Sequence, residues 1–244
     1  MNFHIEKVII DKEINHMGNK TKKLLTISPN SLIMGVILAF VGGFLDAYTY
    51  ITRDGVFATA QTGNMVLFAV RAASTEYNGA ILNVPPFLAF IAGVLVAEYI
   101  KDKHTSYRRA ILLLEFAILF IVGWLPASVP NMLITMSIAF VSSLQIATFN
   151  KLEKWSYNST ITTGNLRTAA QASYTAFVKH NPEAMRKFIG FTAIILSFIC
   201  GALMGTLFCA YLGNTSIWIA AGIILITVIL YKKSIENSKE PLEN

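Results

Sequence analysis

Charged residues are scarce in this sequence: Asp, Glu, Lys and Arg make up only 14% of its 244 residues, against about 25% in soluble domains. Because a soluble domain needs a charged surface, this scarcity argues against a soluble fold. Cysteine is scarce as well, and the two cysteines, Cys200 and Cys209, share one apolar run. On a helix they would lie about 13 Å apart, which is too far for a disulfide bond. A disulfide-stabilised fold is therefore excluded as well.

Long apolar runs are what the sequence has in place of charge, since 54% of its residues are hydrophobic. Six runs approach or reach the roughly 20 residues that a helix needs to cross a hydrocarbon core about 30 Å thick. This pattern predicts an all-α membrane protein with six transmembrane helices and the lipid bilayer as its surroundings. The predicted spans are residues 32–52, 84–100, 107–126, 130–150, 187–211 and 216–232.

The motifs of the common enzyme classes are missing. The sequence has no phosphate loop, no glycine-rich dinucleotide turn and no supported Ser/His/Asp or Cys/His set. Its four histidines lie outside the spans without metal-ligand spacing. We therefore expect no catalytic residues, no enzymatic activity, no metal and no cofactor. The net charge of +6 has to be interpreted by its position relative to the membrane, and we expect no nucleic-acid partner.

Two further stretches, residues 56–73 and 157–178, are too polar for lipid contact and too apolar for ordinary loops. If both crossed the membrane, seven Lys and Arg residues would lie outside the cell, against the positive-inside rule. If both enter and leave on the same side, 18 of the 20 Lys and Arg residues are cytoplasmic. We therefore expect six spans, both termini in the cytoplasm, and a place in the bacterial cell (inner) membrane.

The chain also contains an internal repeat at an offset of 101 residues. Thr62-Gly63-Asn64 then aligns with Thr163-Gly164-Asn165, and a one-residue slip aligns Phe57 with Tyr157. Each unit holds three spans, an odd number, so the second copy is inverted in the membrane, a 3+3 arrangement found in many transporters. Chance similarity within an apolar alphabet is the alternative. The predicted units are a tail at 1–30, a repeat at 31–126 with hairpin 53–83, a repeat at 130–232 with hairpin 151–186, and a tail at 233–244.

Each Thr-Gly-Asn is typical of a helix start, with Thr62 or Thr163 as the N-cap. Two re-entrant half-helices would then point their N-termini at each other near the bilayer centre, where free N–H groups and helix dipoles can hold a solute. An ordinary surface helix is the alternative. We also expect that Gly63 and Gly164 accept no bulky side chain. The predicted solute-binding residues are Thr62, Gly63, Asn64, Thr163, Gly164, Asn165, Arg167 and Gln171.

Two carboxylates lie at membrane depth, Asp46 in the first span and Glu115 in the third. A charged group there is unfavourable by a few kcal/mol unless it is paired, protonated or facing water. Each is therefore a candidate for proton coupling or cation binding, and a structural hydrogen bond is the alternative. Arg167 follows the second motif closely, where it could bind an anion or neutralise one of the two carboxylates.

The run from Gly42 to Tyr48, with Gly55-Val56-Phe57 and Gln61-Thr62-Gly63-Asn64, resembles the signature of the YoaK-like family of bacterial multi-pass membrane proteins, which carry a domain of unknown function. A weaker second motif includes Gln145 and residues 162–165. It departs from the family pattern at Ser143 and at Ile146, which leaves Asp46 without an obvious counterpart. The resemblance implies a six-helix protein of the bacterial cell membrane and supplies no substrate.

These features predict a secondary transporter of a small polar or anionic solute, bound between the two half-helix N-termini at the membrane midplane. A passive channel on the same architecture is the second hypothesis. A membrane-embedded lipid-modifying enzyme is the third and a scaffold or sensor the fourth. The sequence leaves open the solute, the coupling ion and whether the chain forms a homo-oligomer.

Overall fold

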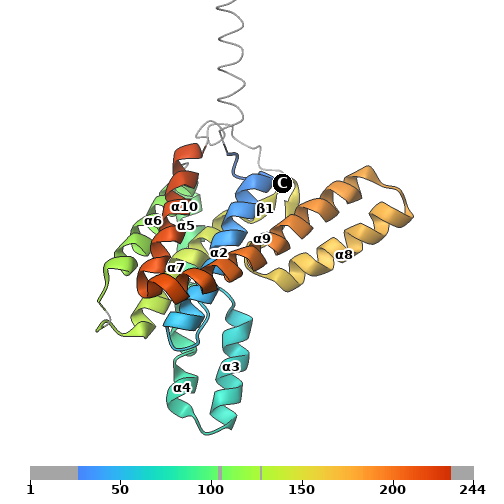
Figure 1. Ribbon diagram of the computed structural model, residues 1–244. Coiled ribbons are helices and arrows are strands. Elements are labelled where there is room, and N and C mark those ends of the chain that lie inside the picture. The colour runs from blue at the N-terminus through green and yellow to red at the C-terminus, as the bar shows by residue number, and fades with distance from the viewer. Residues whose placement is uncertain (1–26, 104–105, 127, 232–244) are drawn as a thin grey trace, which may run out of the picture.

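The computed structural model describes residues 27–103, 106–126 and 128–231, and most of the two predicted tails lies outside these ranges. The described chain is helical apart from one two-stranded hairpin and short connections (Figure 1). Its helices are α2 (Leu32–Thr52), α3 (Gln61–Ala73), α4 (Tyr77–Ile81), α5 (Val84–Lys103), α6 (Tyr107–Trp124), α7 (Asn131–Thr148), α8 (Thr162–Val178), α9 (Pro182–Leu212) and α10 (Ile217–Leu230). Strands β1 (Lys151–Leu152) and β2 (Trp155–Ser156) are antiparallel, and a 3-10 turn, η1 (Gly213–Ser216), links α9 to α10.

All six predicted spans are helices, and local capping explains the ends of two of them, α2 and α9. The Ser31 hydroxyl accepts from the Met34 N–H at 3.2 Å and so begins α2. Asn181 caps α9 in the same way, and because Pro182 follows at the first helical position, α9 begins five residues before the predicted run. Gly213, with φ at +56°, ends α9 in a conformation that favours glycine.

Four described segments are long and apolar enough to cross a membrane: Leu32–Thr52, Tyr77–Lys103, Asn131–Thr148 and Pro182–Leu230. The last contains both α9 and α10, between which the chain reverses at η1 (Figure 1). Helix α6 is not among them, because its 18 residues include Arg108, Arg109 and Glu115. The chain is therefore a helical membrane protein, and the count of six spans stays a prediction.

Helices from the two halves of the chain pack against one another. Helix α2 packs along α9, α5 along α7, and α6 along α10. The α2–α9 contact is backbone to backbone, since a Cβ atom on Gly43 would overlap the Phe198 carbonyl and one on Gly201 would overlap the Phe40 carbonyl. Small residues allow such close approach in membrane proteins. These glycines therefore fix the position of α2, the helix from which the first hairpin starts.

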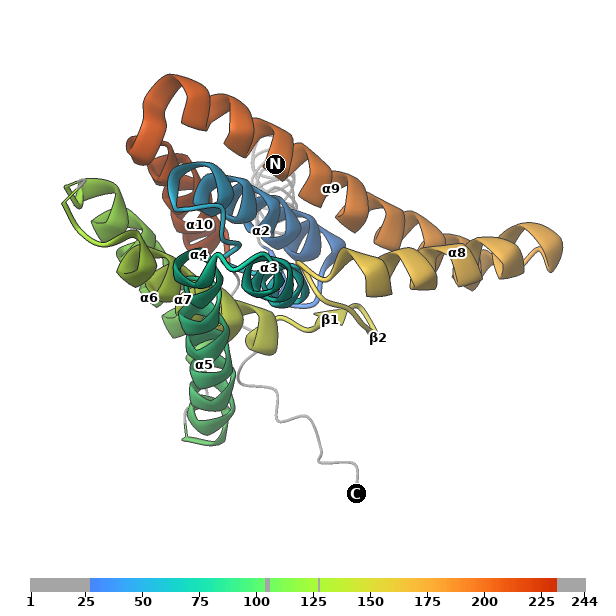
Figure 2. The same cartoon turned by 90° about the horizontal axis from the view of Figure 1, so that it is seen from below.

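The two polar stretches form hairpins that project from this body. Helices α3 and α4 form one projection, and α8 with the first part of α9 forms the other (Figure 1). Seen from below, α3 is viewed end-on near the middle of the molecule, and α8 runs outward from the same region (Figure 2). The starts of α3 and α8 therefore lie near each other, whereas their ends lie far apart.

The predicted N-caps Thr62 and Thr163 are wrong by two residues. Helix α3 has Ala60 at its N-cap and α8 has Ile161, and neither cap uses its side chain. Both helices begin earlier because the two N–H groups just before each helix donate to a side chain outside it. The acceptor is Asp46 for α3 and Asn158 for α8. Thr62 and Thr163 are instead each the second residue of their helix.

Candidate functional site

The first hairpin is attached to α2 by Asp46, whose side chain is buried. Its carboxylate accepts from the Thr59 N–H at 2.7 Å, from the Thr59 hydroxyl at 2.7 Å and from the Ala60 N–H at 3.4 Å. The Ala58 N–H donates to the Thr49 hydroxyl one turn further along α2. Because these donors come just before α3, Asp46 determines where α3 starts. The carboxylate thus has a structural hydrogen-bonding role, which leaves its predicted coupling role untested.

The second hairpin uses an acceptor of its own. The Asn158 Oδ1 atom accepts from the Thr160 N–H at 2.9 Å, the Thr160 hydroxyl at 3.1 Å and the Ile161 N–H at 3.1 Å. Thr160 and Ile161 lie 101 residues after Thr59 and Ala60. Asn158 therefore takes the structural place of Asp46, although it comes from the loop before α8 and not from α7.

The two predicted asparagines stabilise their own hairpins. Asn64 donates to the Phe57 carbonyl at 2.7 Å, and Asn165 donates to the Asn158 carbonyl at 2.6 Å. Both side chains are buried, and each bond reaches back seven residues. This equivalence pairs Phe57 with Asn158, so the alignment of Phe57 with Tyr157 was off by one residue. The offset of 101 extends back through the loop before each half-helix.

A cavity of about 290 Å³ lies between the two hairpins, and we call it the inter-hairpin cavity. The starts of α3 and α8 line it, including the predicted residues Thr62, Gly63 and Thr163. No charged side chain lines it, and half of its lining residues are threonines. The lining consists of Thr59, Ala60, Gln61, Thr62 and Gly63 from the first hairpin, Thr160, Ile161, Thr162 and Thr163 from the second, and Phe90 from α5.

A second cavity of about 570 Å³ adjoins the first, and we call it the α5–α8 cavity. Phe90 and Ile161 line both cavities, so these two side chains separate them. The predicted residues Gly164 and Asn165 line this second cavity and not the first. Its lining consists of Phe90, Val94, Glu98, Ile146, Ala147, Asn150, Ser156, Tyr157, Asn158, Ile161, Gly164, Asn165 and Thr168.

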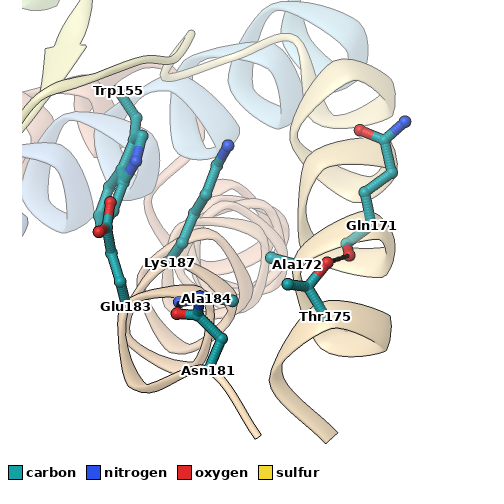
Figure 3. A pocket seen from close by; sticks show the side chains of 8 residues that line it. All are labelled: Trp155, Gln171, Ala172, Thr175, Asn181, Glu183, Ala184 and Lys187. Carbon is teal, nitrogen blue, oxygen red and sulfur yellow. Dashed lines mark hydrogen bonds between the residues drawn. The ribbon is translucent and has the colours of Figure 1, made fainter. Parts of the chain in front are cut away.

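The predicted residues Arg167 and Gln171 line neither of these cavities. Both side chains are exposed on α8. Gln171 instead lines a third cavity beside Trp155 (Figure 3). Arg167 forms no ion pair with any described residue, Asp46 and Glu115 included. The structure therefore separates these two residues from the starts of the half-helices, because α8 carries them outward.

Glu115 is completely buried on α6 and pairs with α7. The Gln145 amide nitrogen lies 2.9 Å from each Glu115 carboxylate oxygen. Neither residue lines the inter-hairpin cavity or the α5–α8 cavity. This structural hydrogen bond joins α6 to α7 through a glutamine, where the sequence suggested an arginine or a tyrosine as the partner, and it leaves the predicted coupling role of Glu115 untested.

Sequence reasoning missed several residues of this region, among them Thr59, Thr160, Phe90 and Asn158. The two threonines could have been found, because they are a further match at the offset of 101 residues. Phe90 gave no signal beyond its apolar character. Asn158 gave none either, because its match in the first half is Phe57 and its role becomes apparent only from the hydrogen bonds.

The helical body and the two paired hairpins define a multi-pass helical membrane protein with a polar cavity between its halves. The chain belongs to the family described as "Protein of unknown function (DUF1275)", which matches residues 34–230. It is similar to the "UPF0700 transmembrane protein YoaK" of Bacillus subtilis (strain 168), with 24% identity over 214 residues that cover 84% of this chain and 94% of the relative. The resemblance to the YoaK-like family is thus confirmed. No solved structure matches the chain.

Proposed function

We propose that this protein is a secondary transporter for a small polar or anionic solute, which binds in the inter-hairpin cavity. The observation that carries the proposal is that the starts of α3 and α8, one from each half of the chain, line a single cavity. The first N–H groups of a helix have no partner within the helix, and its dipole is positive at that end. Two such ends facing one cavity suit carboxylate, phosphate-like or carbonyl oxygens.

The packing of the helices supports a 3+3 inverted repeat. Suppose that α2, α5 and α6 of the first half correspond to α7, α9 and α10 of the second half, in that order. Exchanging the two halves then turns the α2–α9 contact into the α7–α5 contact, and the α6–α10 contact stays a contact between the same two helices. The hydrogen bonds of Asn64 and Asn165 follow the same exchange. In such repeats the solute site lies at the interface of the two halves, near the bilayer midplane. The inter-hairpin cavity lies at such an interface, because residues of both halves line it. In this proposal α3 and α8 are the re-entrant half-helices.

The chemistry of the lining favours an uncharged or negatively charged solute over a cation. Five threonines line the cavity and no carboxylate does. The Thr59 and Thr160 hydroxyls donate to Asp46 and Asn158, which leaves the hydroxyls of Thr62, Thr162 and Thr163 for a solute. Asp46 is close by, but its oxygens are occupied by Thr59 and Ala60. The two helix dipoles, each equivalent to roughly half a positive charge, together balance about one negative charge.

The α5–α8 cavity supplies a route from one side of the membrane. It shares Phe90 with the inter-hairpin cavity and extends along α5 to Glu98, near the basic end of that helix at Lys101 and Lys103. By the positive-inside rule this end faces the cytoplasm. We therefore assign the structure to an inward-facing state of a protein of the bacterial inner membrane, with both termini in the cytoplasm.

Asp46 is the better candidate for proton coupling. Its carboxylate contacts Thr59 and Ala60, which line the inter-hairpin cavity, whereas the partner of Glu115 lines neither cavity of the route. Protonation of Asp46 would weaken its bonds to the loop before α3 and so change the cavity wall. The proposal assigns no catalytic step to any residue.

A thermal-shift experiment tests the binding site. Purified full-length protein is heated with acetate, glycerol or methylammonium, which represent an anion, a neutral polar solute and a cation of similar size. We expect stabilisation by acetate or glycerol and none by methylammonium. Thr163→Val should abolish this stabilisation, whereas Thr206→Val, an exposed residue of α9 outside the cavity, should retain it. Stabilisation by methylammonium alone, or equal stabilisation of both variants, would contradict the proposal.

A further inference from the structure

Trp155 lies at a second polar region, away from the inter-hairpin cavity, where β2 meets α8 and the start of α9. Two cavities flank its indole ring. The first, of about 330 Å³, is the Trp155 cavity of Figure 3. Besides Trp155, five polar or charged residues line it, Gln171, Thr175, Asn181, Glu183 and Lys187, with Ala172 and Ala184. The second, of about 300 Å³, is mainly apolar, and we call it the Leu152 cavity. Leu32, Leu152, Pro182, Met185, Ile189 and Gly190 line it beside Glu153, Trp155 and Arg186.

The segment that forms the Trp155 cavity has an excess of positive charge, although the cavity itself is lined by one lysine, Lys187, and one glutamate, Glu183. Residues 151–187 contain six Lys and Arg residues against two Glu residues. Lys154 pairs with Glu183 at 2.6 Å and Arg186 pairs with Glu153 at 2.7 Å, so both carboxylates are already neutralised. Lys187 forms no ion pair or hydrogen bond with a described residue. Its charge also acts on Glu183 without a direct contact, and its N–H groups remain available to an anion.

Lys187 is held at the cavity by the indole ring. Its Nζ atom lies 5.9 Å from the centroid of the Trp155 ring, and the Lys154 Nζ atom lies at the same distance. Figure 3 shows the Lys187 side chain between Trp155 and α8, with the Gln171 and Thr175 side chains on α8 beyond it. The half-buried lysine thus places its charge in the region between β2, α8 and α9.

The Leu152 cavity opens beside a surface that faces lipid. Ile189, one of its lining residues, is 55% exposed on the apolar face of α9. Tryptophan itself is typical of the interface between hydrocarbon and headgroups. A polar basic cavity and an apolar cavity on the two sides of one interfacial tryptophan match the two parts of a phospholipid.

We propose that Trp155 divides a binding site for one anionic glycerophospholipid. The phosphate and polar headgroup occupy the Trp155 cavity against Lys187, and one acyl chain occupies the Leu152 cavity. A basic pocket between membrane helices on the cytoplasmic side is the kind of site that attracts anionic headgroups. The apolar cavity favours a lipid over free phosphate, because a free anion would leave it empty. This site is independent of solute binding between the hairpins.

Quenching of Trp155 by brominated lipids tests the proposal. The full-length protein carries Trp124→Phe and Trp218→Phe, so that Trp155 is its one tryptophan, and is reconstituted in vesicles of phosphatidylcholine and phosphatidylglycerol. Bromine is placed on the acyl chains of one lipid or the other at equal mole fraction. We expect brominated phosphatidylglycerol to quench Trp155 more strongly. Lys187→Gln should reduce that preference about fivefold, which corresponds to the contribution of one lysine near anionic lipid.

Two further variants separate the site from general surface charge. Lys179→Gln removes one charge at the end of α8, outside both cavities, and should leave the preference unchanged. Lys187→Arg keeps the charge and should retain most of it. Equal quenching by the two lipids would overturn the proposal, as would an equal loss in Lys187→Gln and Lys179→Gln. Loss of the preference in excess inorganic phosphate would show that the site takes the free anion and would also overturn it.

Discussion

Asp46 and Asn158 accept equivalent sets of hydrogen bonds in the two halves of the chain. Each side chain accepts from the N–H and the hydroxyl of one threonine, Thr59 or Thr160, and from the N–H that follows. In the first half the acceptor is a carboxylate on a separate helix, α2. In the second half it is an amide within the loop itself. The first hairpin is thus tied to the helical body by a titratable group, whereas the loop of the second hairpin is held together by a group that does not titrate.

The first prediction concerns stability. Asp46→Ala leaves the buried donors of Thr59 and Ala60 without an acceptor, which should lower the free energy of unfolding by about 3 kcal/mol. Asp46→Asn should lower it by less than about 1 kcal/mol, because Asn158 shows that an amide oxygen serves the same donors. Denaturant unfolding in detergent measures both values. Equal destabilisation by the two substitutions would show that the charge of Asp46, and not its acceptor oxygens, holds the loop.

Much of the fold was predictable because hydropathy and capping are local properties. The six apolar runs became helices with ends within a few residues, since Ser31 and Asn181 act on their own first turns. The repeated Thr-Gly-Asn likewise predicted a helix start in each hairpin, near the starts of α3 and α8. Their start positions were mispredicted because the deciding acceptor for α3, Asp46, is 13 residues away in sequence from Thr59. No local pattern predicts which loop donors a carboxylate on another helix will meet.

The candidate site was predictable in part. Thr62, Gly63 and Thr163 line the inter-hairpin cavity as predicted, because a helix start can only be where the helix begins. Arg167 was placed there by its nearness in sequence, yet one further turn of α8 carries it out of the cavity. Phe90 was missed because an apolar residue in an apolar helix gives no signal until the neighbouring cavities are known.

The second prediction compares the two equivalent glycines. A Cβ atom on Gly63 would lie 3.0 Å from the Phe57 ring, whereas the nearest heavy atom to a Cβ atom on Gly164 is 4.0 Å away. Gly164→Ala should therefore stabilise α8 by up to about 1 kcal/mol, the usual gain in a helix. Gly63→Ala should instead be destabilising, because the close contact of its Cβ atom with the Phe57 ring outweighs the same gain in helix stability. The prediction that neither position accepts a bulky side chain is separate from this difference and stays a prediction.

Thermal unfolding of the two alanine variants measures this difference. Both glycines are the third residue of their helix, so each variant is the control for the other. A lower melting temperature for Gly164→Ala than for Gly63→Ala would contradict the packing described for the two hairpins.

The third prediction concerns proton coupling. Asp46→Asn should abolish the dependence of solute uptake on an imposed pH gradient, because the remaining amide cannot exchange a proton at that position. Glu115→Gln should retain the dependence, since Glu115 contacts Gln145 and lines no part of the proposed route. Uptake into proteoliposomes at matched and unmatched pH measures both. Loss of the dependence in Glu115→Gln alone would transfer the coupling role to that residue.

The fourth prediction concerns topology. In a background with Cys200→Ser and Cys209→Ser, single cysteines replace Asn78, between α3 and α5, or Asp102, near the end of α5. Both positions are exposed, so a thiol at either can react. A membrane-impermeant maleimide added to intact cells should label position 78 and not position 102, because the basic end of α5 is expected in the cytoplasm. Labelling at position 102 from outside would refute the proposed orientation.

The central claim is that a solute crosses the membrane by binding between the starts of α3 and α8. Uptake of radiolabelled acetate and glycerol by proteoliposomes tests it most directly, with wild type, Thr62→Val, Thr163→Val and the control Thr206→Val compared at equal protein content. We predict saturable uptake of at least one solute by wild type and by the control. In the two cavity variants uptake should fall about tenfold, as expected when one hydrogen bond to the solute is lost. Uptake at the wild-type rate in both Thr62→Val and Thr163→Val would contradict the account, as would uptake by wild type no faster than by protein-free vesicles.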